Sequence, residues 1–256
     1  MLLNLTNIYS LFYIFGILSN RMSEAEVPLA QKKKRKRGCK GGKGGRAKKS
    51  SKIYISVAGS SHATRRHYFP QKLRAKLNGD IRFECDNDSF NECISGRRVL
   101  DPNDNIEEKV TSFLMQNAPR PTLQTFVVAG NDLRKSGSPE DVVDCFRKIV
   151  QSCSNIPRVH ILICGLIPSP YEDVNPRFNS KKRFIECNRL LRELELEFPE
   201  KVSFLDVASS LTDEHGDVIM EYYEQNYETD CHLSKRGCQI FVDILYKKMC
   251  GGICKF

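Results

Sequence analysis

The chain has 256 residues, of which 40% are hydrophobic and 28% are charged. This length suits one compact domain with an extension, and the composition excludes a wholly disordered or fibrous chain. The formal net charge is +9, but residues 32–49 alone hold 11 lysines and arginines and no acid, so the remainder carries −2. The body of the protein is therefore not basic, and a nucleic-acid function for it is not favoured by charge.

Residues 1–51 are predicted to be a non-globular extension. Its apolar run, residues 11–18, is shorter than the roughly 20 residues that span a bilayer, so we expect no membrane span. No Lys or Arg precedes the run and no small-x-small pattern follows it closely, so it fits a secretory signal poorly. Met22 opens a polar segment, and a later start of translation there would leave residues 1–21 out of the mature protein.

The basic tract, residues 32–49, is rich in glycine and should stay disordered because it cannot bury apolar surface. One interpretation is a nuclear-localisation signal or an arm that contacts nucleic acid, and the equal alternative is a solvated linker that aids solubility. The densest basic residues are Lys32, Lys33, Lys34, Arg35, Lys36 and Arg37.

From residue 52 onward, short apolar runs alternate with longer segments of helical period. Strands are predicted over residues 52–59, 81–86, 122–130, 158–167 and 201–207. Helices are predicted over about residues 63–77, 105–117, 138–150, 180–198 and 233–249. The third helix has Ser138 as its cap and Pro139 in its first turn, which is a typical helix start.

Five strands alternating with helices predict a parallel sheet with helices on both faces, joined by right-handed crossovers. Residues 52–256 are therefore expected to form a three-layer α/β/α, doubly wound, flavodoxin-like domain with a five-stranded parallel sheet. Ligands of such sheets bind beyond the carboxyl ends of the strands. The residues that follow each strand are thus the candidates for a functional site.

Eleven cysteines, an odd number without a repeated CxxC pattern, favour reduced thiols inside a cell. We therefore expect an intracellular protein, nuclear if the basic tract acts as a signal. We expect Cys145 and Cys164 to be small residues of the hydrophobic core. The Cys and His residues at positions 231–254 do not have the spacing of a familiar zinc finger, so no metal or cofactor is expected.

Three polar residues follow predicted strands or the last loop. Ser61 lies at the turn after the first strand, Asn131 follows the third strand, and His232 opens the last helix. Each of these residues taken alone is common in turns, but together they fall where the architecture requires a site. No Gly-x-Ser-x-Gly elbow and no phosphate-binding glycine motif is present.

The combination resembles the SGNH (GDSL-like) hydrolase superfamily over about residues 52–249. Ser61 matches the serine of its first block, Gly96 the glycine of the second, Asn131 the asparagine of the third and His232 the histidine of the last. Residues 166–168 and 188–191 are also similar to segments of family members. The resemblance implies a nucleophilic Ser61 activated by His232, with an oxyanion hole built from Ser61, Gly96 and Asn131.

The family resemblance implies a serine esterase that hydrolyses a small or acyl-chain carboxylic ester through an acyl-enzyme. Two positions depart from the family pattern. Ser60 replaces the usual Asp of the first block, and Thr229 stands where the family has the acid that orients the histidine. We expect Asp230 to supply that acid, with Glu228 or a backbone carbonyl as alternatives.

Two other functions stay open. The departures at Ser60 and Thr229 are compatible with an inactive SGNH-like binding module, and the basic tract with a nucleic-acid-associated accessory protein of the retroelement type. Among the remaining polar residues, His62 is expected at the surface or at a helix cap. His160 is expected to be a hydrogen-bonded sheet residue. Solvated surface positions are expected for Arg65, Arg66, Arg97 and Arg98, with a place in the cleft that favours an acidic substrate as the alternative. The sequence does not set the oligomeric state.

Overall fold

A computed structural model describes residues 52–64, 69–171, 180–226 and 231–253. The predicted extension and its basic tract lie outside the described residues, and so do Glu228, Thr229 and Asp230. The nuclear or nucleic-acid role of the tract therefore stays a prediction.

The sheet runs in the order β2-β1-β4-β5-β6, with every strand parallel to its neighbours. This is the flavodoxin-like order, so the predicted fold class is confirmed. A further strand, β3, pairs in parallel with the end of β1 and was not expected from the sequence. The strands are β1 (Ile53–Gly59), β2 (Phe83–Glu84), β3 (Glu92–Cys93), β4 (Thr122–Val127), β5 (Val159–Cys164) and β6 (Val202–Leu205).

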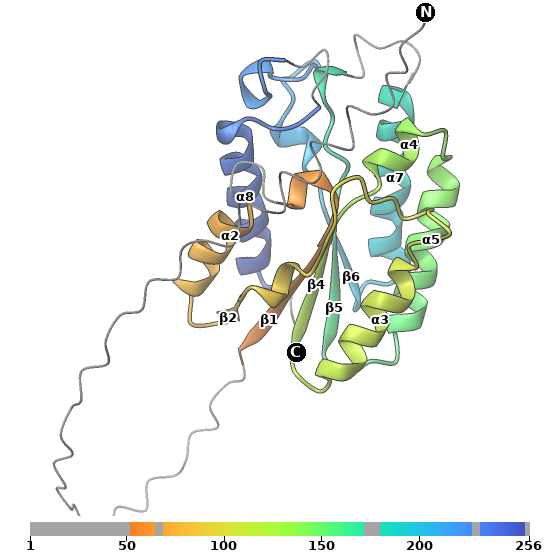
Figure 1. The fold of residues 1–256 in the computed structure, drawn as a ribbon, viewed down its shortest axis with the longest axis vertical. Helices are drawn as coiled ribbons and strands as arrows, with labels where there is room; N and C mark the ends of the chain where they lie inside the picture. The colour runs from red at the N-terminus through yellow and green to blue at the C-terminus, as the bar shows by residue number, and fades with distance from the viewer. Residues whose placement is uncertain (1–51, 65–68, 172–179, 227–230, 254–256) are drawn as a thin grey trace, which may run out of the picture. The chain divides into compact units, whose positions relative to one another are not determined.

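Helices cover both faces of the sheet, as Figure 1 shows. Two helices that contact each other, α2 (Phe69–Asn78) and α8 (Lys235–Cys250), lie on one face. The other face carries α3 (Ile106–Asn117), α5 (Pro139–Cys153) and α7 (Ser180–Glu197). The predicted three layers are therefore present.

Two local differences from the prediction lie beside the candidate site. The predicted first helix is replaced by a short 3-10 helix, η2 (Ser61–Ala63), and by α2, which begins at Phe69. The segment after β4, which contains Asn131, forms a short helix, α4 (Gly130–Arg134). The described residues also form the 3-10 helices η4 (Asp88–Phe90), η5 (Ala208–Ser210) and η6 (Met220–Tyr222).

The helix starts follow their capping residues. The Ser138 side chain accepts a hydrogen bond from the Asp141 N–H, as expected for a helix cap, and α5 begins at Pro139. The side chain of Ser234 caps α8 in the same way through the Gly237 N–H. His232 therefore precedes the last helix by three residues instead of opening it, and it belongs to the loop.

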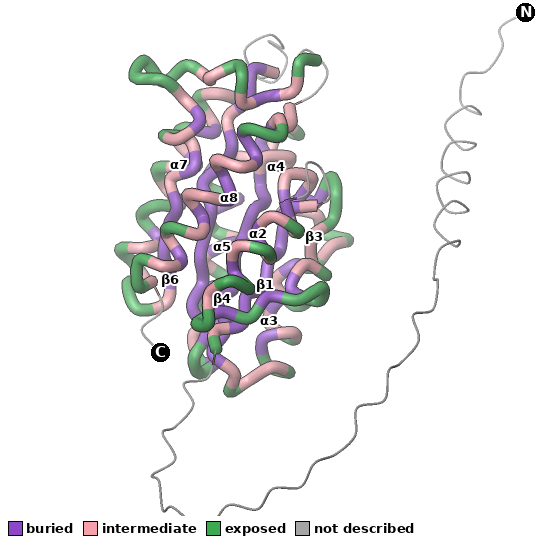
Figure 2. Tube along the Cα trace, turned by 90° about the vertical axis from the view of Figure 1, so that its left-hand side faces the viewer, coloured by how far each residue is buried: buried purple, intermediate pink, exposed green. Residues whose placement is uncertain are grey.

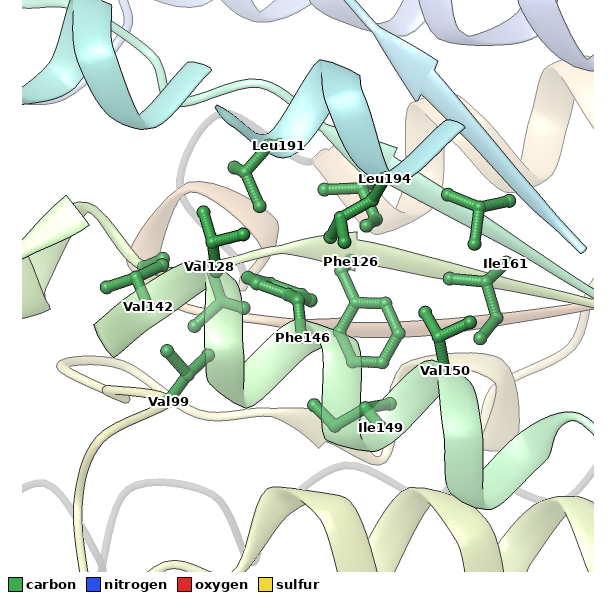
Figure 3. Packing of buried hydrophobic residues seen from close by; sticks show 14 of the residues in the cluster. Val99, Phe126, Val128, Val142, Phe146, Ile149, Val150, Ile161, Leu191 and Leu194 are labelled. Atoms are coloured by element: carbon green, nitrogen blue, oxygen red, sulfur yellow. The ribbon is translucent and has the colours of Figure 1, made fainter. Parts of the chain in front are cut away.

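The sheet is buried on both faces, which Figure 2 shows as a continuous buried interior. On the α5 side, Phe126 packs edge to face against Phe146 of α5, with ring centroids 5.4 Å apart. Leu191 and Leu194 of α7 complete this cluster (Figure 3). A second cluster, on the α2 and α8 side, includes the stacked rings of Phe69 and Phe241. Burial of these apolar side chains is the main stabilising contribution to the sheet and its helices.

Cysteine thiols contribute to the core. Cys164 on β5 and Cys187 on α7 are buried free thiols, in agreement with the expectation for Cys164. Burial raises the pKa of Cys187 to about 12, so this thiol stays protonated and unreactive near neutral pH. Cys145 is half-buried on α5, and its thiol contacts the Val99 carbonyl oxygen at 3.4 Å.

In the part of the chain that the structure describes, no helix is long and apolar enough to cross a membrane. The same residues contain no group of three or more His, Cys, Asp or Glu side chains placed to hold a metal ion.

His160 confirms the prediction of a hydrogen-bonded sheet residue. Its Nε2 atom lies 3.0 Å from the Ser203 hydroxyl on the neighbouring strand. Burial lowers the pKa of His160 to about 4, and the positive charges of Lys201 and Lys248 add to this effect. The folded protein thus holds this imidazole neutral, whereas the unfolded chain protonates it near pH 6.5.

The stability of the protein should fall on acidification because of His160. Between about pH 6.5 and pH 4 the unfolded state binds a proton that the folded state does not, so stability rises with pH across this window. We expect the wild type to lose about 2 to 3 kcal/mol more than His160→Gln between pH 7 and pH 4. Urea unfolding at a series of pH values measures the free energy of unfolding of both proteins. An equal loss of stability in the two proteins between pH 7 and pH 4 would contradict this prediction.

Candidate active site

The turn after β1 positions the candidate nucleophile. The Ser60 N–H donates to the Val127 carbonyl at 2.9 Å, which continues the pairing of β1 with β4 beyond the last strand residue. Ser61 then opens η2, and its carbonyl accepts from the Thr64 hydroxyl at 2.8 Å. A side chain at Gly59 would collide with Ala63, since an added Cβ would lie 2.3 Å from the Ala63 Cβ. The tight turn therefore requires a glycine before the two serines.

The second block lies beside this turn. The Ile94 N–H donates to the Gly59 carbonyl at 2.9 Å, which ties the segment after β3 to the end of β1. A turn follows in which the Arg97 N–H donates to the Ile94 carbonyl at 3.1 Å. Gly96 in this turn has φ +78°, in the left-handed region that favours glycine.

Arg97 is a buried structural residue, and the expectation that it is solvated was wrong. Its side chain is 0% exposed and pairs with two carboxylates. Nε donates to Asp104 at 2.7 Å, Nη2 donates to Glu92 at 2.9 Å, and Nη1 donates to the Glu92 carbonyl. The guanidinium offers five donors in a fixed plane, so it can hold β3 and the Asp104 loop together on either side of Gly96.

The third block is joined to the second by two side chains. The Asn131 amide donates to the Arg97 carbonyl at 3.1 Å. The buried Asp132 carboxylate accepts from the N–H groups of Val99 and Leu100 at 3.0 and 2.9 Å. Burial raises the pKa of this carboxyl group, against the lowering effect of the two N–H donors. The chain reaches this arrangement through Ala129, whose φ of 92° places a non-glycine residue in a strained region.

The fourth block is held in a loop between η6 and α8. The His232 carbonyl accepts from the Glu224 N–H at 3.1 Å, and the Ser234 N–H donates to the Tyr222 carbonyl at 2.8 Å. The Nε2 atom of His232 is buried. The ring of His232 lies against that of His62, with centroids 5.1 Å apart and an interplanar angle of 38°. His62 is thus half-buried in the site, whereas the sequence predicted a surface or capping role.

Ser61 and His232 line one cavity of about 670 Å³. Its size is in the range of small-molecule sites. The lining includes Ser95, next to Gly96, but neither Gly96 nor Asn131 among the described residues. The other lining residues are Ala63, Thr64, Pro70, Phe90, Cys93 and Ile94. The structure therefore brings the first, second and fourth blocks to one cavity and links the third block to it through Arg97. The predicted acid, Asp230, lies outside the described residues.

The two further segments that are similar to family members, residues 166–168 and 188–191, contact each other. The side chain of Asn188 on α7 accepts from the Leu166 N–H at 2.6 Å and donates to the Leu166 carbonyl at 3.3 Å. One amide therefore satisfies both backbone groups of the residue that follows β5 and Gly165, and it fixes the loop at this edge of the sheet.

Comparison with models of protein families identifies the family of the chain. The model of the GDSL-like lipase/acylhydrolase family matches residues 54–240. The chain therefore belongs to this family, which is part of the SGNH hydrolases. No curated protein shows significant sequence similarity to it.

Solved structures share the fold at low sequence identity. An aryl esterase of M. smegmatis is 16% identical, with a TM-score of 0.54 over 78% of this chain and 98% of that chain. Est24, a carbohydrate acetylesterase of Sinorhizobium meliloti, is 15% identical, with a TM-score of 0.53 over 78% of this chain and 99% of that chain. At these identities the likeness establishes the fold alone.

Replacing Asp132 tests the link between the second and third blocks. Asp132→Asn should lower the free energy of unfolding by about 2 kcal/mol, because an amide offers one acceptor atom and turns a donor toward a backbone N–H. Asp144→Asn is the control, since Asp144 pairs with Arg147 at the surface, where such a change costs less than about 0.5 kcal/mol. Urea unfolding measures both, and equal stability of Asp132→Asn and wild type would refute the assigned role.

Proposed function

We propose that this chain is a serine esterase that hydrolyses a carboxylic ester through a covalent acyl-enzyme. The observation that carries the proposal is that Ser61 and His232, far apart in sequence, line one cavity beside the carboxyl ends of β1 and β3. Membership of the GDSL-like lipase/acylhydrolase family supports the same chemistry.

In the proposed reaction, the Ser61 hydroxyl oxygen attacks the ester carbonyl carbon while His232 takes the hydroxyl proton. The tetrahedral intermediate then collapses, the bond to the alcohol breaks, and the alcohol leaves with the proton from His232. A water molecule attacks the acyl-enzyme by the same route, which releases the acid and restores the serine. His232 acts as base in each attack and as acid in each collapse.

The proposed oxyanion hole consists of the N–H groups of Ser61 and Gly96 and the side chain of Asn131. An amide nitrogen carries two hydrogens, and the bond to the Arg97 carbonyl uses one of them, so the second can serve the oxyanion. Loss of a single donor of this kind typically costs about 3 to 4 kcal/mol of transition-state stabilisation. We propose Asp230 as the acid that orients His232, with Glu228 or a backbone carbonyl as alternatives.

The apolar part of the cavity lining supports an ester that carries an apolar group. The lining has apolar side chains at Pro70, Phe90 and Ile94 and no Asp, Glu, Lys or Arg among the described residues. Because an aryl esterase and a carbohydrate acetylesterase share the fold, short acyl esters of aryl alcohols are the first substrates to test.

Labelling with a fluorophosphonate tests the nucleophile. The wild type should be labelled, Ser61→Ala should lose the label, and His232→Ala should be labelled at least about a hundredfold more slowly. Ser60→Ala is the matched control, because this neighbouring serine is buried and should leave labelling intact. Hydrolysis of p-nitrophenyl acetate is measured in parallel. Labelling of Ser61→Ala at the wild-type rate would refute the assignment of Ser61 as the nucleophile. Absence of both labelling and turnover in the wild type would favour a binding module.

A further inference from the structure

His62 is the residue directly after the proposed nucleophile, and the esterase mechanism does not use it. Its Nε2 atom lies 3.3 Å from the carbonyl oxygen of Cys231, the residue directly before His232. Its ring also lies against the His232 ring, with centroids 5.1 Å apart. One side chain from the nucleophile turn therefore contacts both the backbone and the ring at the fourth block.

The contact with Cys231 determines which ring nitrogen of His62 carries a proton. A carbonyl oxygen can only accept a hydrogen bond, so Nε2 of His62 must carry the proton and donate it. This assigns either the Nε2–H tautomer or the imidazolium form to His62. In both forms the bond to the Cys231 carbonyl holds the His62 ring beside that of His232.

The loop around His232 is fixed on its opposite side by backbone bonds. The Glu224 N–H holds the His232 carbonyl, and Tyr223 and Leu233 form an antiparallel bridge. These bonds fix the chain at and after His232 against the segment that contains η6. The contact from His62 to the Cys231 carbonyl fixes the chain just before His232, from the side of the nucleophile.

We propose that His62 is a positioning residue that holds the His232 loop and ring in the geometry needed for proton transfer from Ser61. The inference rests on the proposed function, since it assigns a task to His62 in the same reaction. A general base must lie within hydrogen-bond reach of the proton it takes, and a displacement of about 1 Å can cost a hundredfold in rate. Because Ser61 and His62 are consecutive, the same turn sets the position of both the nucleophile and the base.

Three substitutions separate the two contacts of His62. His62→Ala removes the ring and the donor, His62→Phe retains a ring against His232, and His62→Gln retains an amide donor for the Cys231 carbonyl. We expect His62→Ala to lower kcat for p-nitrophenyl acetate by about tenfold or more and to change KM by less than about twofold. His62→Gln should recover most of the lost kcat. His215→Ala is the control, because the side chain of this histidine is 75% exposed at the surface.

A second measurement does not depend on activity. The ring nitrogen resonances of the protein's five histidines can be assigned in 1H–15N NMR spectra by single substitutions. Those of His232 should shift in His62→Ala, return toward the wild type in His62→Gln and stay unchanged in His215→Ala. This measurement tests the positioning even if Ser61 proves not to react, so failure of the esterase assignment is distinguishable from failure of the role of His62.

The outcomes that overturn the proposal are specific. Wild-type kcat together with unchanged His232 resonances in His62→Ala would remove the positioning role. Loss of all turnover in His62→Ala while His232→Ala stays active would make His62 the base itself. If His62→Ala fails to fold, His62→Phe decides, because it lacks the donor to the Cys231 carbonyl: wild-type kcat together with wild-type His232 resonances in His62→Phe would also overturn the proposal.

Discussion

The parallel pairing of β1 with β4 determines where every candidate site residue lies. The two strands are aligned from Tyr54 opposite Thr122 to Gly59 opposite Val127, and the Ser60 N–H extends the pairing by one bond. Both strands are buried on both faces, so a shift in their register would carry apolar side chains out of two packed layers at once. The ends of these strands are therefore level, and the segments that contain Ser61 and Asn131 leave the sheet at the same edge.

Polar side chains then fix the loops that leave this edge. Asp132 holds the backbone at Val99 and Leu100, Asn188 holds Leu166, and Arg97 joins Glu92 to Asp104. Asp132 and Arg97 are buried, and Asn188 makes two hydrogen bonds to one residue. Loss of one partner would leave a buried donor or acceptor without a replacement, which is more costly than the bond itself is stabilising. These bonds tie the loops at this edge of the sheet to β3 and to α7.

The sequence predicted the parts of the fold that depend on local pattern. Apolar runs such as residues 122–127 have the composition of a doubly buried strand, and Ser138 with Pro139 marks the start of α5. The strand β3 was missed because its two residues have no periodicity, and it exists through the tertiary contact with β1.

For the candidate site, the sequence predicted that Ser61 and His232 lie together, but not how they are held. Motif order alone placed Ser61 and His232 at one site, and the cavity they share agrees with this. The burial of Arg97 depends on carboxylates at positions 92 and 104, and the contact between His62 and His232 joins distant segments. Neither pairing leaves a signal in a single sequence, because each is set by the way the chain folds back on itself.

The close approach of Gly59 to Ala63 has a consequence for how this sequence can diverge. An added Cβ at position 59 would lie 2.3 Å from the Ala63 Cβ and 3.1 Å from the Val127 carbonyl oxygen. The two positions thus have room for one methyl group between them. An alanine at position 59 becomes tolerable only with a glycine at position 63, and even then the Val127 carbonyl must move by a few tenths of an ångström. In related sequences these two positions should therefore vary as a pair or not at all.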